Sequence, residues 1–266
     1  MPTILSILAN AGGVGKTTLG VHIAYEMGRR NFKVALFDLD PHRSLDVFCG
    51  LPSAEPLNTI AHVFAKDFKG DYPFVSCWGN PKLEVCQGHP VLTETANELV
   101  IRKRGEYALA DRFKSYPLFH DLVILDCPAT LGMLNVNALA ASTYILVPVQ
   151  LEIKSIASSA ELVEWCMTMA EELHLELCPP IIGFVPCMYD RKEAGHRHYL
   201  QQLPEVGNAL GIKIYPPIRN SSEFPNSSSY GLPLQKYRPH HAACRDFKAL
   251  ADDLSNLIKQ ERLVMT

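Results

Sequence analysis

The segment at residues 10–18 has the composition of a phosphate-binding loop. Three glycines allow the backbone to fold closely around an anion without Cβ clashes, so that successive N–H groups point inward. Lys16 can reach the β- and γ-phosphates of a nucleotide, and the Thr17 hydroxyl can ligate Mg²⁺. The helical pattern that follows adds the positive end of its dipole. The sequence therefore predicts that a Mg²⁺-bound nucleotide contacts Ala11, Gly12, Gly13, Val14, Gly15, Lys16, Thr17 and Thr18.

Two carboxylates, Asp38 and Asp40, stand where an apolar stretch at residues 33–38 ends. Ligands of an open α/β sheet bind beyond the carboxyl ends of its strands, so both acids should lie near the nucleotide. One can hold the water shell of Mg²⁺ and one can orient the attacking water, which is most of what phosphoryl transfer requires. We therefore predict Lys16, Asp38 and Asp40 as catalytic residues and Asp38 as a metal ligand. Alternatively, one of the two acids only caps the following turn.

A third acid, Asp126, follows four apolar residues at 122–125. An acidic strand end opposite a phosphate loop is the expected place for a Mg²⁺ ligand. The predicted metal ligands are thus Thr17, Asp38 and Asp126. The competing interpretation of Asp126 is a turn residue without a metal.

The elements that would position these residues alternate between buried strands and amphipathic helices. Strands are expected at residues 3–8, 33–38, 83–86, 122–126, 144–149, 181–185 and 213–215. Helices are expected at residues 17–30, 156–173 and 241–263, the second with a buried stripe of Ala157, Ala160, Val163 and Met167. Residues 226–231 should form a polar loop. This order predicts the α/β class, with residues 1–266 forming a single P-loop NTPase domain whose mostly parallel, twisted sheet carries helices on both faces.

Composition limits the classes of function. The chain has 266 residues, 47% of them hydrophobic and 20% charged, which is typical of a folded globular protein. The net charge of -3 predicts no general attraction to DNA or anionic membranes, so such contacts need a local basic patch. Eight scattered cysteines indicate reduced thiols in a cytosolic protein. No apolar run approaches the ~20 residues of a membrane span, and the first strand leads directly into the loop, which argues against a signal peptide.

Several segments together resemble a known family, the deviant Walker ATPases of the ParA and MinD group. The resemblance rests on residues 12–18, 38–41, 126–129, 134–138, 147–150, 188–190 and 230–233, which fall in the family's order. It implies that the chain binds ATP and Mg²⁺, forms a homodimer with ATP and hydrolyses ATP slowly. In ParA-like members the ATP dimer binds non-specific DNA, and an adaptor protein on the cargo stimulates hydrolysis. The implied location is cytoplasmic and nucleoid-associated.

The chain departs from the family at Ala11, where a lysine normally reaches the partner's nucleotide across the dimer. Lys154 is our candidate replacement in trans; otherwise it is a solvated lysine, with or without Glu152 as a partner. Loss of the family lysine resembles the maintenance-of-carboxysome-distribution subgroup, and a plasmid or chromosome partition ATPase is the alternative. A nucleotide-bound scaffold that scarcely hydrolyses is a further hypothesis. A reductase of the nitrogenase iron-protein type would need a second cysteine to accompany Cys127.

Candidate partner surfaces lie in the second half of the chain. Non-specific DNA binding requires several cations on one face, and the candidates are Lys236, Arg238, Arg245, Lys248, Lys259 and Arg262. A solvated helix face is the other interpretation. Residues 191–192 and 196–198 form a weaker basic group, whose histidines could make binding pH-sensitive. The C-terminal helix lacks the free apolar face of a membrane anchor, so no membrane partner is expected.

The family contacts the adenine base with the chain after the last strand. By that resemblance, Pro217 and Arg219 should line the base pocket, and Met188 should lie against the ring. Apolar and arginine side chains suit an aromatic face.

Overall fold

The strands of the computed structural model, which describes residues 2–264, form one twisted sheet in the order β3-β4-β2-β5-β1-β6-β7. All neighbouring strands are parallel except β3, which pairs antiparallel with β4. The strands are β1 (Thr3–Ile7), β2 (Val34–Asp38), β3 (Phe74–Cys77), β4 (Asn80–Cys86), β5 (Leu122–Asp126), β6 (Tyr144–Gln150) and β7 (Ile181–Cys187). The predicted α/β class and mostly parallel sheet are confirmed.

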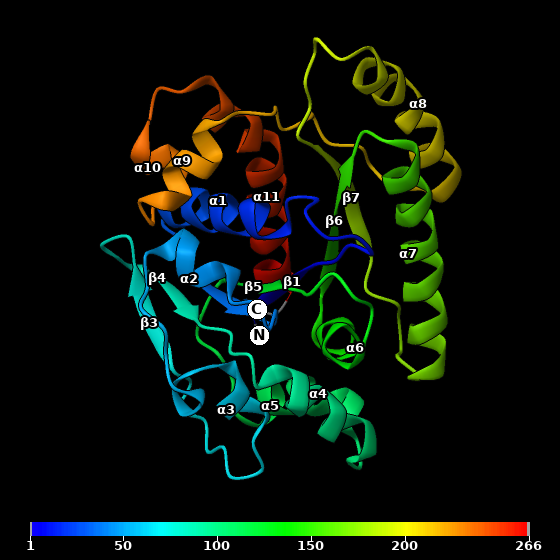
Figure 1. Ribbon diagram of the computed structural model, residues 1–266. Helices are drawn as coiled ribbons and strands as arrows, with labels where there is room; N and C mark the ends of the chain where they lie inside the picture. The colour runs from blue at the N-terminus through cyan, green and yellow to red at the C-terminus, as the bar shows by residue number, and fades with distance from the viewer. Residues whose placement is uncertain (1, 265–266) are drawn as a thin grey trace.

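Helices cover both faces of the sheet (Figure 1). One face carries α1 (Lys16–Arg29), α2 (Ser44–Cys49) and α11 (Lys248–Val264). The other carries α3 (Ile60–Phe64), α4 (Leu92–Ile101), α5 (Ala108–Ser115), α6 (Met133–Ala141), α7 (Ile153–Glu172) and α8 (Ala194–Leu210). The short helices α9 (Glu223–Ser229) and α10 (Leu234–Tyr237) lie near α1. Every residue of the central strands β1, β2 and β5 is buried, because both faces are covered.

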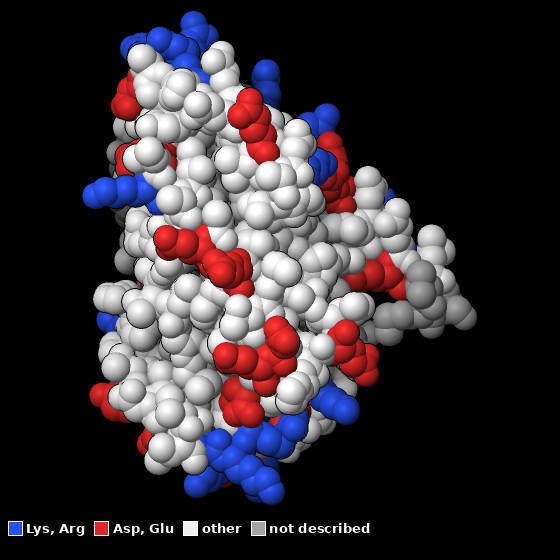
Figure 2. All heavy atoms as spheres, turned by 90° about the vertical axis from the view of Figure 1, so that its right-hand side faces the viewer, with Lys and Arg blue, Asp and Glu red and all other residues white. Residues whose placement is uncertain are grey.

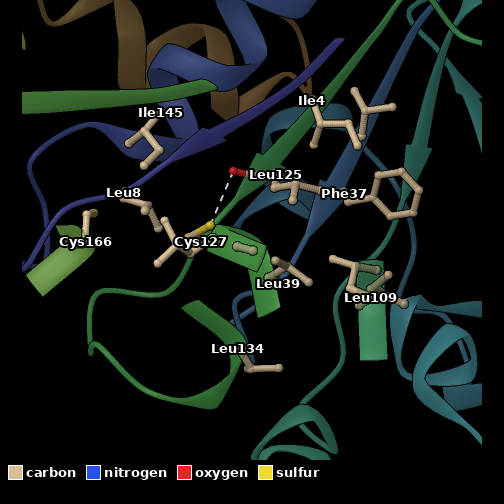
Figure 3. Packing of buried hydrophobic residues seen from close by; sticks show 14 of the residues in the cluster. Ile4, Leu8, Phe37, Leu39, Leu109, Leu125, Cys127, Leu134, Ile145 and Cys166 are labelled. Atoms are coloured by element: carbon tan, nitrogen blue, oxygen red, sulfur yellow. Dashed lines mark hydrogen bonds between the residues drawn. The ribbon is translucent and has the colours of Figure 1, made fainter. Parts of the chain in front are cut away.

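The core on the α3–α8 side lies directly beneath the acidic strand ends. Phe37, Leu39 and Leu125 pack there with Leu109 of α5 (Figure 3). The Cys127 thiol belongs to the same cluster and donates to the Leu125 carbonyl at 3.5 Å. The loops that carry the functional carboxylates therefore rest on a packed apolar layer.

Three local predictions were wrong. Residues 213–215 do not form a strand; only Ile214 makes an isolated bridge to Phe184, because the segment crosses the sheet edge too briefly to build a ladder. Residues 226–229 belong to α9 rather than to a loop. The helix packs against the protein because Ser227 is buried and Phe224 contacts the ring of His22. The stripe predicted on α7 is shifted: Met167 is 63% exposed. Packing on β6 instead buries Ser159, Leu162, Val163, Cys166 and Ala170.

Two other regions are more irregular than a simple pattern suggests. The predicted helix at 241–263 begins as a 3-10 segment, Ala242–Phe247, and becomes α-helical at Lys248. Turn-rich residues 50–81 contain a short 3-10 segment, Pro56–Asn58, as well as α3 and β3. Within residues 2–264, no helix is long and apolar enough to cross a membrane.

Candidate functional site

The phosphate-binding loop connects β1 to α1 at the carboxyl edge of the sheet. Gly13 and Gly15 have φ values of 73° and 99°, a left-handed backbone that side chains rarely adopt. Lys16 is largely buried, and its Nζ donates to the Ala11 carbonyl at 3.0 Å. Burial lowers the pKa of Lys16, while the charge of Asp126 opposes the shift. The Lys16 side chain therefore extends back over the phosphate-binding loop, where it is predicted to contact the phosphates of the nucleotide.

Asp126 and Thr17 meet at the base of the loop. The Thr17 hydroxyl donates to Asp126 Oδ2 at 2.7 Å. Asp126 Oδ1 is buried and has no hydrogen-bond partner among the described residues. Burial raises the pKa of Asp126 to about 7, and the Thr17 hydrogen bond and the Lys16 charge only partly offset the shift. An orphaned carboxylate oxygen beside a hydroxyl is a donor set that fits Mg²⁺, which prefers a few hard oxygens plus phosphates.

Other metal centres lack support in the described part of the chain. It contains no group of three or more His, Cys, Asp or Glu side chains placed to hold a metal ion. Cys127 is buried within the core rather than presented at a surface, so nothing here favours a cluster shared between subunits. A magnesium ion held mainly by nucleotide phosphates needs no such protein cage.

Asp38 lies opposite Asp126 in the register of β2 and β5. Its carboxylate is completely buried and accepts backbone N–H groups from Asp40 at 3.0 Å and Leu45 at 3.2 Å. Burial raises the pKa of Asp38 well above its usual value, with the Asp126 charge as a second cause. Asp38 thus holds the connection from β2 to α2, as the capping alternative expects. Its role as a metal ligand stays a prediction.

Asp40 is placed differently. Its side chain is 19% exposed. It lines a cavity of about 350 Å³ between the β2–α2 turn, α4 and residues 128–135. Asp40 Oδ1 accepts the His42 backbone N–H at 2.9 Å and lies 2.8 Å from His42 Nδ1. Of the two predicted catalytic acids, Asp40 is the one that borders open space.

A second cavity, of about 510 Å³, adjoins the loop at Gly15 and Thr18. Met188 and Arg219 line this cavity, whereas Pro217 is not among its lining residues; their contact with the base stays a prediction. Arg219 is held by a bidentate ion pair to Asp246 at 2.7 Å. Several other lining residues were not predicted from the sequence, chiefly Phe48 and the α9 segment with Ser222, Phe224, Pro225 and Ser228. The serine-rich sequence of this segment could have indicated the cavity wall, because hydroxyl groups and aromatic rings are suitable contacts for a nucleoside.

Lys154 lies in the first turn of α7, beside the phosphate loop. Gln150, at the end of β6, donates from Nε2 to the Gly13 carbonyl at 3.4 Å, which places this edge next to the loop. Lys154 is exposed and forms no ion pair with Glu152 or any other described residue. Its neighbour Ile153 is 68% exposed. Lys154 and Ala11 therefore lie at the same edge of the sheet, but no hydrogen bond or ion pair joins them within one chain.

The six predicted DNA contacts fall into two groups. Arg238 pairs with Glu223 at 3.0 Å, Arg262 pairs with Asp121, and Lys236 donates to the Trp78 carbonyl. The other three candidates, Arg245, Lys248 and Lys259, are exposed and form no ion pair with another residue of 2–264. The side of the molecule that carries α7 and α8, to which none of the six belongs, has Lys and Arg toward its ends and Asp and Glu between them (Figure 2). The basic surface is therefore partly neutralised within the chain.

Comparison with known proteins places this geometry in a family. Residues 2–178 match the AAA_31 family, described as an AAA domain. The chromosome partitioning protein ParA of Myxococcus xanthus (strain DK1622) is 28% identical over 255 residues, covering 94% of this chain and 87% of the relative.

Solved structures show the same fold. A McdA variant from Cyanothece in complex with ATP is similar with a TM-score of 0.84 at 19% identity, over 96% of each chain. The septum site-determining protein MinD from Pyrococcus horikoshii OT3, complexed with Mg-ADP, has a TM-score of 0.77 at 19% identity, over 97% of each chain. Because the family match spans more than half of its residues, the chain belongs to the AAA_31 family as a ParA/MinD-type ATPase.

Proposed function

We propose that this ATPase is a dimerising switch that positions a cargo on DNA. The ATP-bound homodimer binds non-specific nucleoid DNA in the cytoplasm, and an adaptor protein on the cargo stimulates its slow hydrolysis. Carboxysomes are the favoured cargo, because Ala11 replaces the family lysine and the fold resembles McdA. A plasmid or chromosome partition ATPase is the alternative, supported by the relative named ParA.

The observation that carries the proposal is the pairing of Thr17 with Asp126 beneath the glycine loop. Loop N–H groups and Lys16 would hold the phosphates, and Thr17 and Asp126 would hold Mg²⁺, with Asp38 supporting its water shell. When bound, Mg²⁺ neutralises charge on the β- and γ-phosphates. Asp40 borders open space near this point and would orient the attacking water.

Dimerisation would supply the cation that Ala11 lacks. Lys154 is exposed at the loop edge and has no ion-pair partner in the part of the chain that the structure describes, so a second subunit facing this edge could receive its ammonium group at the phosphates. Such a contact adds affinity only when the nucleotide is present, because otherwise the lysines of the two subunits repel each other. ATP would then control assembly.

Nucleotide uptake and phosphate release together test the proposal. We expect the pure protein to bind ATP with Mg²⁺ and to release phosphate slowly, and Asp40→Ala to bind ATP while releasing phosphate at least about tenfold more slowly. Intact binding with no release, with or without DNA and cargo-side protein, would favour the scaffold hypothesis. No uptake of ATP by folded protein would exclude the whole assignment.

DNA binding needs its own test. With ATP present, the double variant Arg245→Glu/Lys248→Glu should bind DNA much more weakly and with a shallower salt dependence, since each lost phosphate contact removes about 0.9 from the slope. Arg238→Glu is the control, because the Arg238 guanidinium already forms an ion pair with the Glu223 carboxylate. Equal loss in both variants would show that the effect reflects added negative charge rather than DNA contacts of Arg245 and Lys248, and unchanged binding by the double variant would show that the DNA surface lies elsewhere.

A further inference from the structure

His42 is a residue to which the proposed function assigns no role, although it touches the predicted catalytic acid. It follows Pro41 in the turn between β2 and α2, and its side chain is 88% exposed. An imidazole so exposed contributes little to the core. It nevertheless lies 2.8 Å from Asp40 Oδ1 through Nδ1, rather than pointing freely into solvent.

Both interactions made by His42 converge on one oxygen of Asp40. The backbone N–H of His42 donates to Oδ1 at 2.9 Å, and Nδ1 donates to the same atom when that nitrogen carries the proton. Among residues 2–264, no group donates to Asp40 Oδ2. One oxygen is therefore fixed and the other remains available to a water.

The surroundings leave the carboxylate few other restraints. The Asp40 backbone is anchored, because its N–H donates to Asp38 and its carbonyl accepts from Arg43 at 3.0 Å. Asp40 lines a cavity together with Pro41, His42, Pro128 and Ala129, and its side chain is partly exposed. Without the imidazole, only one backbone N–H would restrain rotation of the carboxylate toward this open space.

We propose that His42 is a positioning residue that locks the Asp40 carboxylate through Nδ1, so that Oδ2 is held toward the attacking water. The inference rests on the proposed role of Asp40 and adds the group that orients it. Misplacing a reacting group by about 1 Å can slow a reaction by about a hundredfold, so a lost restraint should reduce turnover rather than nucleotide binding.

The test compares substitutions that differ in where they offer a donor. His42→Ala keeps the backbone N–H but removes the imidazole, and should lower kcat about tenfold with nearly unchanged ATP affinity. His42→Asn carries an amide nitrogen near the position of Nδ1 and should restore most of the rate. His42→Gln offers its donor one bond further out and should stay slow. His240→Ala, an exposed histidine with no carboxylate contact in the described chain, should match the parent.

Single-turnover phosphate release from ATP and Mg²⁺, measured beside ATP binding, separates the outcomes. If Asp40→Ala is slow and His42→Ala equals the parent, the positioning role is refuted while the proposed function stands. If Asn fails to restore the rate, or Gln restores it equally, the assignment to Nδ1 is refuted. If Asp40→Ala equals the parent, or the parent releases no phosphate, the proposed function fails together with this inference.

Discussion

The acids at the site lie at different depths, and depth determines what each can do. Asp38 and Asp126 are buried, so their charged forms are disfavoured and their pKa values rise. Asp40 lines the cavity, and among residues 2–264 no group donates a hydrogen bond to its Oδ2. Two buried carboxylates across neighbouring strands destabilise the folded chain unless a cation lies between them. Lys16 supplies part of that charge, and Mg²⁺ would supply the rest.

Asp126→Asn should therefore stabilise the metal-free protein while weakening its affinity for Mg·ATP. The folded-state pKa of about 7 lies above the ordinary value of 3.8, so the ionised carboxylate opposes folding increasingly as pH rises from 4 to 7. The gain in unfolding free energy should grow over that range and level off above pH 7, reaching at most about 4 kcal/mol. Urea unfolding at pH 5 and pH 8 without Mg²⁺ measures it. Asp67→Asn, at an exposed aspartate, serves as control, and a gain that does not increase with pH would contradict the prediction.

His22 should make the fold sensitive to acid. The ring is completely buried: Nδ1 contacts the Thr18 carbonyl at 2.6 Å, and Nε2 accepts from the Leu234 N–H at 3.1 Å. Only the neutral ring can donate from Nδ1 and accept at Nε2, and burial lowers the pKa of His22 to about 4. Its contribution is complete above pH 6.5 and is lost as pH falls toward 4, by about 3 kcal/mol.

The prediction for His22 is tested by comparing how steeply the unfolding free energies of a variant and of the parent depend on pH. His22→Asn keeps a donor toward Thr18 but cannot titrate, so its unfolding free energy should decline less steeply between pH 6.5 and 4 than that of the parent. The unfolding free energy of the variant will be lower than that of the parent at every pH, because the variant loses the stacking of the imidazole ring on Phe247. Parallel slopes for the two proteins would reject the assignment.

At the scale of elements, the end of β4 supports the turn that carries the acids. Gln87 donates from Nε2 to Asp46 Oδ1 and to the Pro52 carbonyl, both at 2.8 Å. Gly88 lies against the turn itself: a Cβ at this position would come within 2.9 Å of Asp38 Cγ and 2.8 Å of the Asp40 carbonyl oxygen. Neither neighbouring atom can move at low energetic cost, because the Asp40 carbonyl belongs to the backbone and the Asp38 side chain is buried.

Gly88→Ala should accordingly displace the β2–α2 turn and lower the hydrolysis rate by about tenfold or more, with a smaller effect on ATP binding. Gly195→Ala is the matched control, since a Cβ there meets nothing within 4 Å and alanine favours the helix. Steady-state phosphate release and nucleotide titration on both variants give the comparison. A Gly88 variant with parental turnover would show that the turn tolerates the shift.

At the scale of the whole molecule, one edge of the sheet gathers the loop, the acids and an exposed lysine, while the opposite end carries none of them. A single chain leaves Lys154 without a described ion-pair partner, and the Ala11 side chain supplies none of the charge that a lysine at this position would carry. A second subunit facing the same edge would complete both.

Lys154→Ala should weaken ATP-dependent dimerisation at least about tenfold, or about 1.4 kcal/mol, while the monomer still binds ATP. Sedimentation velocity with ATP and Mg²⁺, at several protein concentrations, measures the change. Lys103→Ala removes another exposed lysine, on the connection after α4, and should dimerise like the parent. Identical sedimentation of the Lys154 variant and the parent would reject the trans contact.

Local sequence was sufficient wherever a structural feature follows from the order of residues along one segment. The glycine loop, the acidic ends of residues 33–38 and 122–126 and the alternation of strands with helices all read correctly, because each depends on neighbours a few positions apart. The family and the parallel sheet followed from those same segments.

Tertiary structure decided what depends on contacts between distant segments. Only the folded structure shows that Asp38 is buried while no group among residues 2–264 donates to Asp40 Oδ2. It also shows that Glu223 pairs with Arg238 and that α9 lines the cavity beside the loop. Burial and ion pairing arise from side chains far apart in the chain, and local spacing carries no information about which of them meet.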